Sequence, residues 1–243
     1  MTTGIIVQAR MGSSRLPGKV MQDLAGAPAL ERLFERLRRV KGPPLIVLAT
    51  STLPGDDPIA DYVSATPDIR LWRGSEQDVL RRYADAARHF DLDPIVRITA
   101  DCPLMEPSCI DAVLDAYRAL PGCQYADNVL PRTFPHGYDA QVLSRQALEA
   151  ADREATLPAD REHVGPFIIR HADRFPATHA APCDPPCAEL RITLDYPEDL
   201  TLIRAIYERL YPANPNFGLG DILALREKDP ALFDINKSRA IYG

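Results

Sequence analysis

The chain has 243 residues, of which 46% are hydrophobic, and it carries a formal net charge of −6. A chain of this size can bury a full core, so we expect residues 1–243 to form a single domain. The acidic balance argues against a protein that binds nucleic acid through its overall field. No hydrophobic run approaches membrane-spanning length and residues 1–4 are too short for a secretion signal, which predicts a cytoplasmic protein.

The first half of the chain alternates apolar runs with helical patterns. The apolar runs predict buried strands at residues 5–7, 45–49, 69–72 and 95–99. Helical spacing and helix-start signals predict helices over 30–40, from 56–58, over 80–87 and from 107. The charged face of the first helix, which includes Arg32 and Arg36, is expected to be a solvated surface. Such alternation is typical of a mostly parallel sheet flanked by helices, with ligands beyond the carboxyl ends of its strands.

The second half has a different pattern. Residues 128–138 contain two prolines and a glycine without periodicity, so we expect an ordered excursion over the sheet. A strand at 140–143 and a helix capped by Ser144 should follow. Residues 161–171 read as a helix interrupted at Gly165-Pro166. A further strand is predicted at 190–194, a helix from 195–197 and a last helix over 221–228.

The loop after the first strand combines small residues with positive charge. Residues 8–19 (QARMGSSRLPGK) contain two glycines, two serines, Arg10, Arg15 and Lys19. Backbone N–H groups at close range and fixed positive charge are what a polyphosphate needs. The spacing excludes a Walker loop, because Pro17 stands where its second glycine should be, and it excludes the dinucleotide fingerprint. The alternative is a surface connection whose glycines only permit turns.

Two aspartates at the ends of apolar runs are candidate metal ligands. Asp101 follows the strand at 95–99 and shares one strand face with Arg97 and Thr99, while Asp195 follows the run at 190–194. Carboxylates in this position can hold Mg²⁺ between themselves and phosphate oxygens. For Asp195 a plain helix cap is the alternative. We therefore expect Lys19, Asp101 and Asp195 to converge on one magnesium-bound nucleoside triphosphate.

Six motifs, in order along nearly the whole chain, resemble one enzyme family. Residues 9–19 resemble the signature loop of sugar-acid cytidylyltransferases, which activate 3-deoxy-manno-octulosonate and acylneuraminates with CTP. The chain is most similar to the branch of spore-coat polysaccharide biosynthesis cytidylyltransferase-like proteins. The motifs that match this branch are residues 73–83 (RGSEQDVLRRY), 97–104 (RITADCPL), 132–139 (RTFPHGYD), 161–164 (REHV) and 195–200 (DYPEDL).

The resemblance implies a nucleotide-diphospho-sugar transferase fold, glycosyltransferase-A-like and Rossmann-like. It implies an Mg²⁺-dependent, homodimeric enzyme that transfers CMP from CTP to a sugar acid for polysaccharide or glycan biosynthesis, with no nucleic-acid or membrane partner. The implied catalytic residues are Arg15, Lys19 and Asp101, with the metal on Asp101 and Asp195. The implied nucleotide-binding residues are Ala9, Arg10, Gly12, Ser13, Ser14, Arg15, Lys19, Arg73, Ser75, Asp78, Val79, Arg82, Thr99, Ala100 and Asp101.

The acceptor is expected in a subregion of about residues 125–185, which would also carry the dimer contacts. The implied acceptor-binding residues are Asn128, Arg132, His136, Gly137, Asp139, Arg161, Glu162 and His163. The chain departs from the family pattern at His136, where aspartate is common, and at Gly165, where threonine is common. These departures leave the sugar unidentified. Two other functions stay open: a nucleotidyltransferase with another nucleotide or a non-sugar acceptor, such as a phosphonate or sugar phosphate, and a non-catalytic nucleotide-binding protein.

Overall fold

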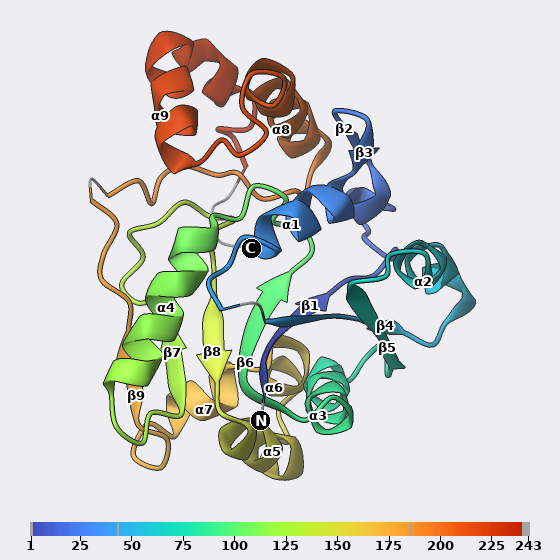
Figure 1. Ribbon diagram of the computed structural model, residues 1–243, viewed down its shortest axis with the longest axis vertical. Helices are drawn as coiled ribbons and strands as arrows, with labels where there is room; N and C mark the ends of the chain where they lie inside the picture. The colour runs from blue at the N-terminus through green and yellow to red at the C-terminus, as the bar shows by residue number, and fades with distance from the viewer. Residues whose placement is uncertain (1, 43, 185, 240–243) are drawn as a thin grey trace.

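A seven-stranded mixed sheet, in the order β5-β4-β1-β6-β8-β7-β9, forms the centre of the protein (Figure 1). The computed structural model describes residues 2–42, 44–184 and 186–239. Four parallel strands confirm the four predicted in the first half: β1 (Thr2–Gln8), β4 (Leu45–Ser51), β5 (Ile69–Gly74) and β6 (Leu92–Thr99). The sheet continues through β8 (Gln141–Leu143), antiparallel to β6, and then β7 (Tyr125–Asp127) and β9 (Ala177–His179).

Helices cover both faces of the sheet, because the central strands are apolar on both sides. Ile5 and Val7 pack on one face with α1 (Ala29–Leu37), α2 (Asp57–Ser64) and α4 (Pro107–Ala119). Ile6 packs on the other face, which is covered by α3 (Val79–His89), α5 (Arg145–Glu154), α6 (Pro158–His163) and α7 (Pro166–Arg170). Continuous apolar strands are typical of parallel sheets buried in this way.

A third apolar cluster lies at one end of the molecule, around α8 (Pro197–Leu210) and α9 (Leu219–Lys228) (Figure 1). Tyr207 and Phe217 are buried there and meet edge-on, with ring centroids 5.3 Å apart. The small hairpin of β2 (Asp23–Leu24) and β3 (Ala27–Pro28) contributes Leu24 to this cluster. Short 3-10 helices complete the fold: η1 (Lys19–Met21), η2 (Pro54–Asp56) and η3 (Pro230–Asp234).

Several helix predictions are confirmed in detail. The Ser144 hydroxyl accepts a hydrogen bond from the Ala147 N–H and so caps α5. The helical stretch after Leu157 is broken into α6 and α7, as predicted from Gly165-Pro166. Within the described residues, no helix is long and apolar enough to cross a membrane.

The predicted strand at residues 190–194 is wrong. The segment is buried, but among the described residues its strand pairing is limited to one isolated bridge, between Arg191 and His136, and its next hydrogen bond goes to the turn after β6. The Ile192 N–H donates to the His136 carbonyl, and the Leu194 N–H donates to the Asp101 carbonyl. The segment therefore links the loop around His136 to the end of β6 without joining the sheet.

The predicted solvated surface on α1 is wrong for Arg32 and Arg36, which are 5% and 2% exposed. Arg36 lies over the Phe217 ring, 4.5 Å from its centroid, and donates hydrogen bonds to the Phe217 carbonyl (3.2 Å) and the Tyr207 hydroxyl (3.4 Å). The helical pattern of α1 could not show this, because the cluster that covers these arginines comes from the other end of the chain.

We expect Arg36→Ala to lower the free energy of unfolding by about 2–4 kcal/mol, because it leaves a cavity and a buried carbonyl without its donor. Urea denaturation followed by circular dichroism measures the change. Arg38→Ala is the control, at the C-terminal cap of the same helix. Arg38 is exposed and its ion pairs with Glu31 and Asp68 lie at the surface, so its loss should cost about 1 kcal/mol or less. Equal effects of the two substitutions would contradict a structural role for Arg36.

Candidate active site

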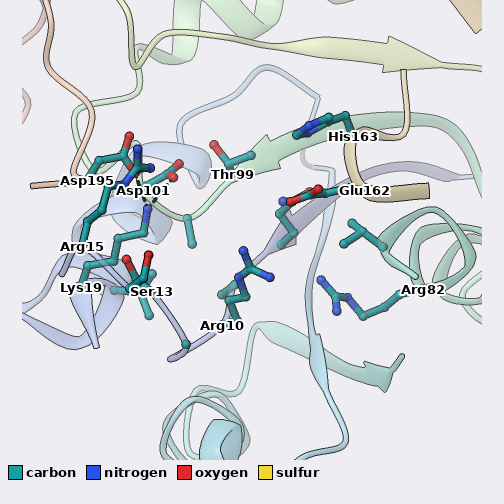
Figure 2. A pocket seen from close by; sticks show the side chains of 17 residues that line it. Arg10, Ser13, Arg15, Lys19, Arg82, Thr99, Asp101, Glu162, His163 and Asp195 are labelled. Atoms are coloured by element: carbon teal, nitrogen blue, oxygen red, sulfur yellow. Dashed lines mark hydrogen bonds and ion pairs between the residues drawn. The ribbon is translucent and has the colours of Figure 1, made fainter. Parts of the chain in front are cut away.

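A cavity of about 430 Å³ lies where β1 and β6 end, at the edge of the sheet expected to bind a ligand. Loop residues from after β1 and the last residues of β6 form one wall, and α3 and α6 contribute the opposite wall (Figure 2). The lining residues are Gln8, Ala9, Arg10, Gly12, Ser13, Ser14, Arg15, Lys19, Val20, Val79, Arg82, Thr99, Ala100, Asp101, Glu162, His163 and Asp195. Most of the expected nucleotide-binding residues are therefore brought together.

The loop after β1 is closed by its own backbone and by Asp56. The Met11 carbonyl accepts hydrogen bonds from the Ser13 and Gly18 N–H groups, and Gly18 takes a left-handed conformation (φ 65°) that favours glycine. Asp56 is buried and accepts from the Met11 N–H at 2.7 Å. Burial acts to raise the pKa of Asp56, but hydrogen bonds from Met11 and Ser51 outweigh it and lower the pKa. Asp56 stands at the N-cap position of α2, but its side chain makes no capping hydrogen bond to that helix and anchors the loop.

Lys19 joins the two predicted metal ligands. Its Nζ lies 2.7 Å from Asp101 Oδ2 and 2.7 Å from Asp195 Oδ1 (Figure 2). Burial acts to raise the pKa of Asp101, but the charge of Lys19 and its hydrogen bond lower that pKa to about 2. Burial acts to lower the pKa of Lys19, but the two carboxylates raise it above its ordinary value. Lys19 and Asp101 are therefore charged at neutral pH. The three side chains meet as expected, and the magnesium-bound triphosphate on which they should converge stays a prediction.

Asp195 is held by cations on both of its oxygens and does not cap α8. Its Oδ1 lies 3.3 Å from Arg15 Nη2, and its Oδ2 lies 3.1 Å from Arg191 Nη2. Capping is done by buried Asp199, which accepts from the Asp195 and Tyr196 N–H groups. The carboxylate of Asp195 therefore remains available to face the cavity.

The other end of the cavity contains arginines without carboxylate partners. Among the described residues, neither Arg10 nor Arg82 forms an ion pair; Arg82 is 2% exposed, and its guanidinium donates to the Ser75 carbonyl. Burial lowers the pKa of Arg82. Glu162 and His163 reach this end from α6, after which buried Val164 adopts the rare γ-turn conformation (φ 68°, ψ −55°), closed by a hydrogen bond from the Gly165 N–H to the His163 carbonyl. Such a conformation costs a β-branched residue about 1–3 kcal/mol and is common next to functional sites.

Three expected nucleotide-binding residues and Arg161 do not line the cavity. Arg73 pairs with Asp57 at 2.8 Å, and the Ser75 hydroxyl accepts from the Asp78 N–H. Asp78 caps α3 and also pairs with Arg161 at 2.6 Å. Arg161, which also contacts Asp152, thereby holds α6 against α3. Asp78 and Arg161 therefore help to position α3 and α6, the helices that bring Val79 and Glu162 to the cavity.

The expected acceptor residues of the loop at 128–139 also lie outside the cavity lining. Asn128 is buried and hydrogen-bonded to the Tyr138 carbonyl and the Ala140 N–H, and Arg132 pairs with Asp139 at 2.6 Å. His136 Nδ1 lies 3.4 Å from Arg191 Nη1, and burial lowers the pKa of His136. Gly137 (φ 116°) leaves room that a Cβ would fill, 2.9 Å from the backbone of Ile192.

Sequence reasoning missed Gln8, Val20, Asp56, Arg191 and Asp199. Gln8 is the register partner of Thr99. Its position at the end of β1 would have indicated a place in the site, but only after the order of the strands was known. The roles of Arg191 and Asp199 depend on the irregular 190–194 segment, for which no periodic pattern exists.

The mostly parallel sheet, the cavity at its carboxyl edge and the lysine-bridged aspartates beside a cationic loop are the arrangement expected of a nucleotidyltransferase of Rossmann-like fold. A sequence model of the family described as cytidylyltransferase matches residues 4–211, and the chain belongs to this family.

Two relatives match all or nearly all of the chain, and a third matches about half of it. The spore coat polysaccharide biosynthesis protein SpsF of Bacillus subtilis is 29% identical over 237 residues, covering 93% of this chain and 94% of that protein. The structure of a cytidylyltransferase from Leptospira borgpetersenii matches with a TM-score of 0.89 at 30% identity, covering 100% of both chains. A 3-deoxy-manno-octulosonate cytidylyltransferase of Anaeromyxobacter is 37% identical over 114 residues, 46% of each chain. The expected family and fold are confirmed.

The lowered pKa of Asp101 predicts a loss of stability in acid. Because the folded-state pKa of about 2 lies below the ordinary value of 3.8, the contribution is complete above about pH 4 and is lost as the pH falls towards 2. Its size is at most about 2 kcal/mol. Urea unfolding of protein freed of metal and nucleotide should show a steeper decline over this range for the wild type than for Asp101→Asn. Parallel curves would contradict the assignment.

Proposed function

We propose that the protein couples CTP to a sugar acid, giving a CMP-sugar and pyrophosphate, with Mg²⁺ as its metal. The observation that carries this proposal is the ion-paired group of Lys19, Asp101 and Asp195 at the end of a cavity lined by the cationic loop. Phosphoryl-type transfer needs alignment and neutralisation of charge on phosphate oxygens more than it needs covalent chemistry. The cavity supplies that charge.

The proposed reaction is attack by a hydroxyl oxygen of the acceptor on the α-phosphorus of CTP. A new oxygen–phosphorus bond forms, the bond to the oxygen that bridges to the β-phosphate breaks, and pyrophosphate leaves with that electron pair. Arg15 and Lys19 are placed to neutralise charge on the triphosphate, and the loop backbone at Gly12 and Ser13 is placed to donate hydrogen bonds. Asp101 is ionised at neutral pH and is the candidate acceptor for the hydroxyl proton.

The donor set fits a hard divalent cation. Asp101 and Asp195 offer carboxylate oxygens that already share one positive group, the Lys19 amine, and Mg²⁺ prefers one or two carboxylates with water and phosphate. A bound ion would stabilise charge on the triphosphate and its leaving group. A Mycobacterium tuberculosis protein with an 18% identical chain and a TM-score of 0.55 was solved as a complex with manganese, which supports a divalent metal in this fold.

The sugar-acid acceptor is supported by the relatives. One matching protein is a 3-deoxy-manno-octulosonate cytidylyltransferase, and a structural neighbour, 18% identical with a TM-score of 0.65, is a CMP:2-keto-3-deoxy-manno-octonic acid synthetase complexed with CTP. The SpsF relative supports a role in polysaccharide biosynthesis.

Pyrophosphate release tests this function. We expect release with CTP and one or more members of a panel of ulosonic and nonulosonic acids, at least tenfold faster than with UTP, GTP or ATP, and abolished by a chelator and restored by Mg²⁺. Turnover only with a phosphonate or a sugar phosphate would show that the acceptor is of that class and not a sugar acid. No pyrophosphate with any nucleotide and acceptor would indicate a protein that only binds nucleotide.

Lys19→Ala and Asp101→Asn should each lower kcat by about a hundredfold or more, the cost of losing one transition-state contact of about 3 kcal/mol. Lys228→Ala is the control, because Lys228 is exposed at the end of α9. Circular dichroism should show that both variants keep the fold. Wild-type turnover in either variant would remove that residue from the mechanism.

We also propose a homodimer. Leu130 and Leu157, in the expected subregion at 125–185, are 46% and 53% exposed, so they are candidate contact residues of the dimer. Light scattering should give twice the chain mass of 26.9 kDa, and Leu157→Asp should weaken the dimer if this surface forms it. A wild type at the mass of one chain would rule out the dimer.

A further inference from the structure

Arg97 on β6 has a guanidinium that no carboxylate of the described residues balances. Its side chain lies on the same strand face as Thr99, the last residue of β6, after which the turn carries Asp101. Its Nη1 donates to Gln141 Oε1 and its Nη2 to Gln8 Oε1, both at 3.3 Å, and its Nε is buried without a partner in the described part of the chain. A guanidinium has five N–H donors, so two long bonds to neutral amides leave three available.

The position of Arg97 connects the nucleotide cavity to the expected acceptor side. Gln8 lines the cavity and is the register partner of Thr99, so its hydrogen bond ties Arg97 to the cavity edge. Gln141 is the register partner of Arg97 on β8. Arg97 thus lies between Gln8, which lines the cavity, and β8, the strand that follows the loop at 128–139.

The neighbouring arginines on the acceptor side differ from Arg97 in this respect. Arg132 pairs with Asp139, and Arg191 pairs with Asp195 and Asp199. A half-buried guanidinium without a carboxylate retains part of its desolvation cost, which an anionic ligand can offset. A carboxylate is suited to this role because two parallel N–H groups can meet its two oxygens.

We propose that Arg97, oriented by Gln8 and Gln141, binds the carboxylate of the acceptor and so selects acidic acceptors. This inference rests on the proposed function and assigns its acceptor-recognition residue. The amide oxygens of both glutamines face Arg97, which leaves their NH₂ groups to donate to the same ligand.

Gly165 belongs to this arrangement. A Cβ at residue 165 would lie 3.3 Å from Gln141 Oε1, so a larger residue would press on the amide that orients Arg97. The departure from the family pattern at Gly165 therefore lies beside the proposed carboxylate receptor, where it affects the shape of the acceptor subsite.

Arg97→Gln and Arg97→Lys test the inference, with Arg70→Gln as the matched control on β5, since Arg70 is exposed. For the best acidic acceptor, Arg97→Gln should lower kcat/KM by about a hundredfold, and Arg97→Lys should restore part of the loss. The Kd of CTP, measured by calorimetry without acceptor, should stay within threefold. An unchanged kcat/KM, or a Kd for CTP weakened as much as the acceptor KM, would overturn the inference.

A second comparison uses the acceptor acid and its carboxamide, and its first arm needs only the wild type, so that arm is independent of the folding of a variant. The wild type should use the carboxamide of the same acceptor about a hundredfold less efficiently than the acid, while Arg97→Gln should treat the two alike. Equal use of acid and amide by the wild type would overturn the inference.

The outcomes separate this inference from the proposed function. Turnover of phosphonates or sugar phosphates alone would contradict the sugar acid as acceptor. It would also contradict the binding of its carboxylate by Arg97, although transfer of CMP from CTP would still hold. If sugar acids were turned over but Arg97→Gln had no effect, only the role of Arg97 would fail. Turnover confined to uncharged acceptors, or none at all, would overturn both.

Discussion

The contact of Lys19 with Asp101 and Asp195 determines the geometry of the site. It joins three segments that are far apart in the sequence: the loop after β1, the end of β6 and the start of α8. A buried lysine is costly unless its charge is balanced, and here two carboxylates balance it. The Asp101 carbonyl accepts from the Leu194 N–H and the Thr193 hydroxyl, so the two aspartates are also fixed relative to each other through the backbone. The cationic loop consequently faces both carboxylates before any ligand binds.

Charge is divided along the cavity in a way that the net charge of −6 does not show. At one end, Lys19 and Arg15 are paired with aspartates, which positions them. At the other end, Arg10 and Arg82 lack carboxylate partners among the described residues. Paired cations are held in place, whereas unpaired cations retain a desolvation cost that a bound anion reduces. A polyanion lying along this cavity would therefore meet both fixed and uncompensated positive charge.

The sequence predicted the parts of the fold that local patterns determine. β1, β4, β5 and β6 are continuous apolar runs because both faces of a parallel sheet are buried, and such runs are visible without knowledge of partners. The position of the cavity, with Lys19 and Asp101 in its lining, was predicted from the rule that the carboxyl ends of parallel strands share one edge. Arg36 and the 190–194 segment were predicted wrongly for a shared reason. Arg36 is buried by Phe217, and Ile192 hydrogen-bonds to His136, so both depend on contacts distant in the sequence, which helical or alternating periodicity does not encode.

The same distinction applies within the candidate site. The expected acceptor residues Arg132 and Asp139 lie in an irregular loop where they satisfy each other, whereas Arg97 lies on a regular strand with donors to spare. A loop can adjust its side chains to pair internally, but the pleat of β6 fixes the direction of Arg97 toward the face that carries Thr99. A strand residue therefore cannot easily find a compensating carboxylate, and an unpaired charge there is stronger evidence for a ligand than an ion pair in a loop. On this proposal, acceptor recognition lies on the same sheet that positions the nucleotide site.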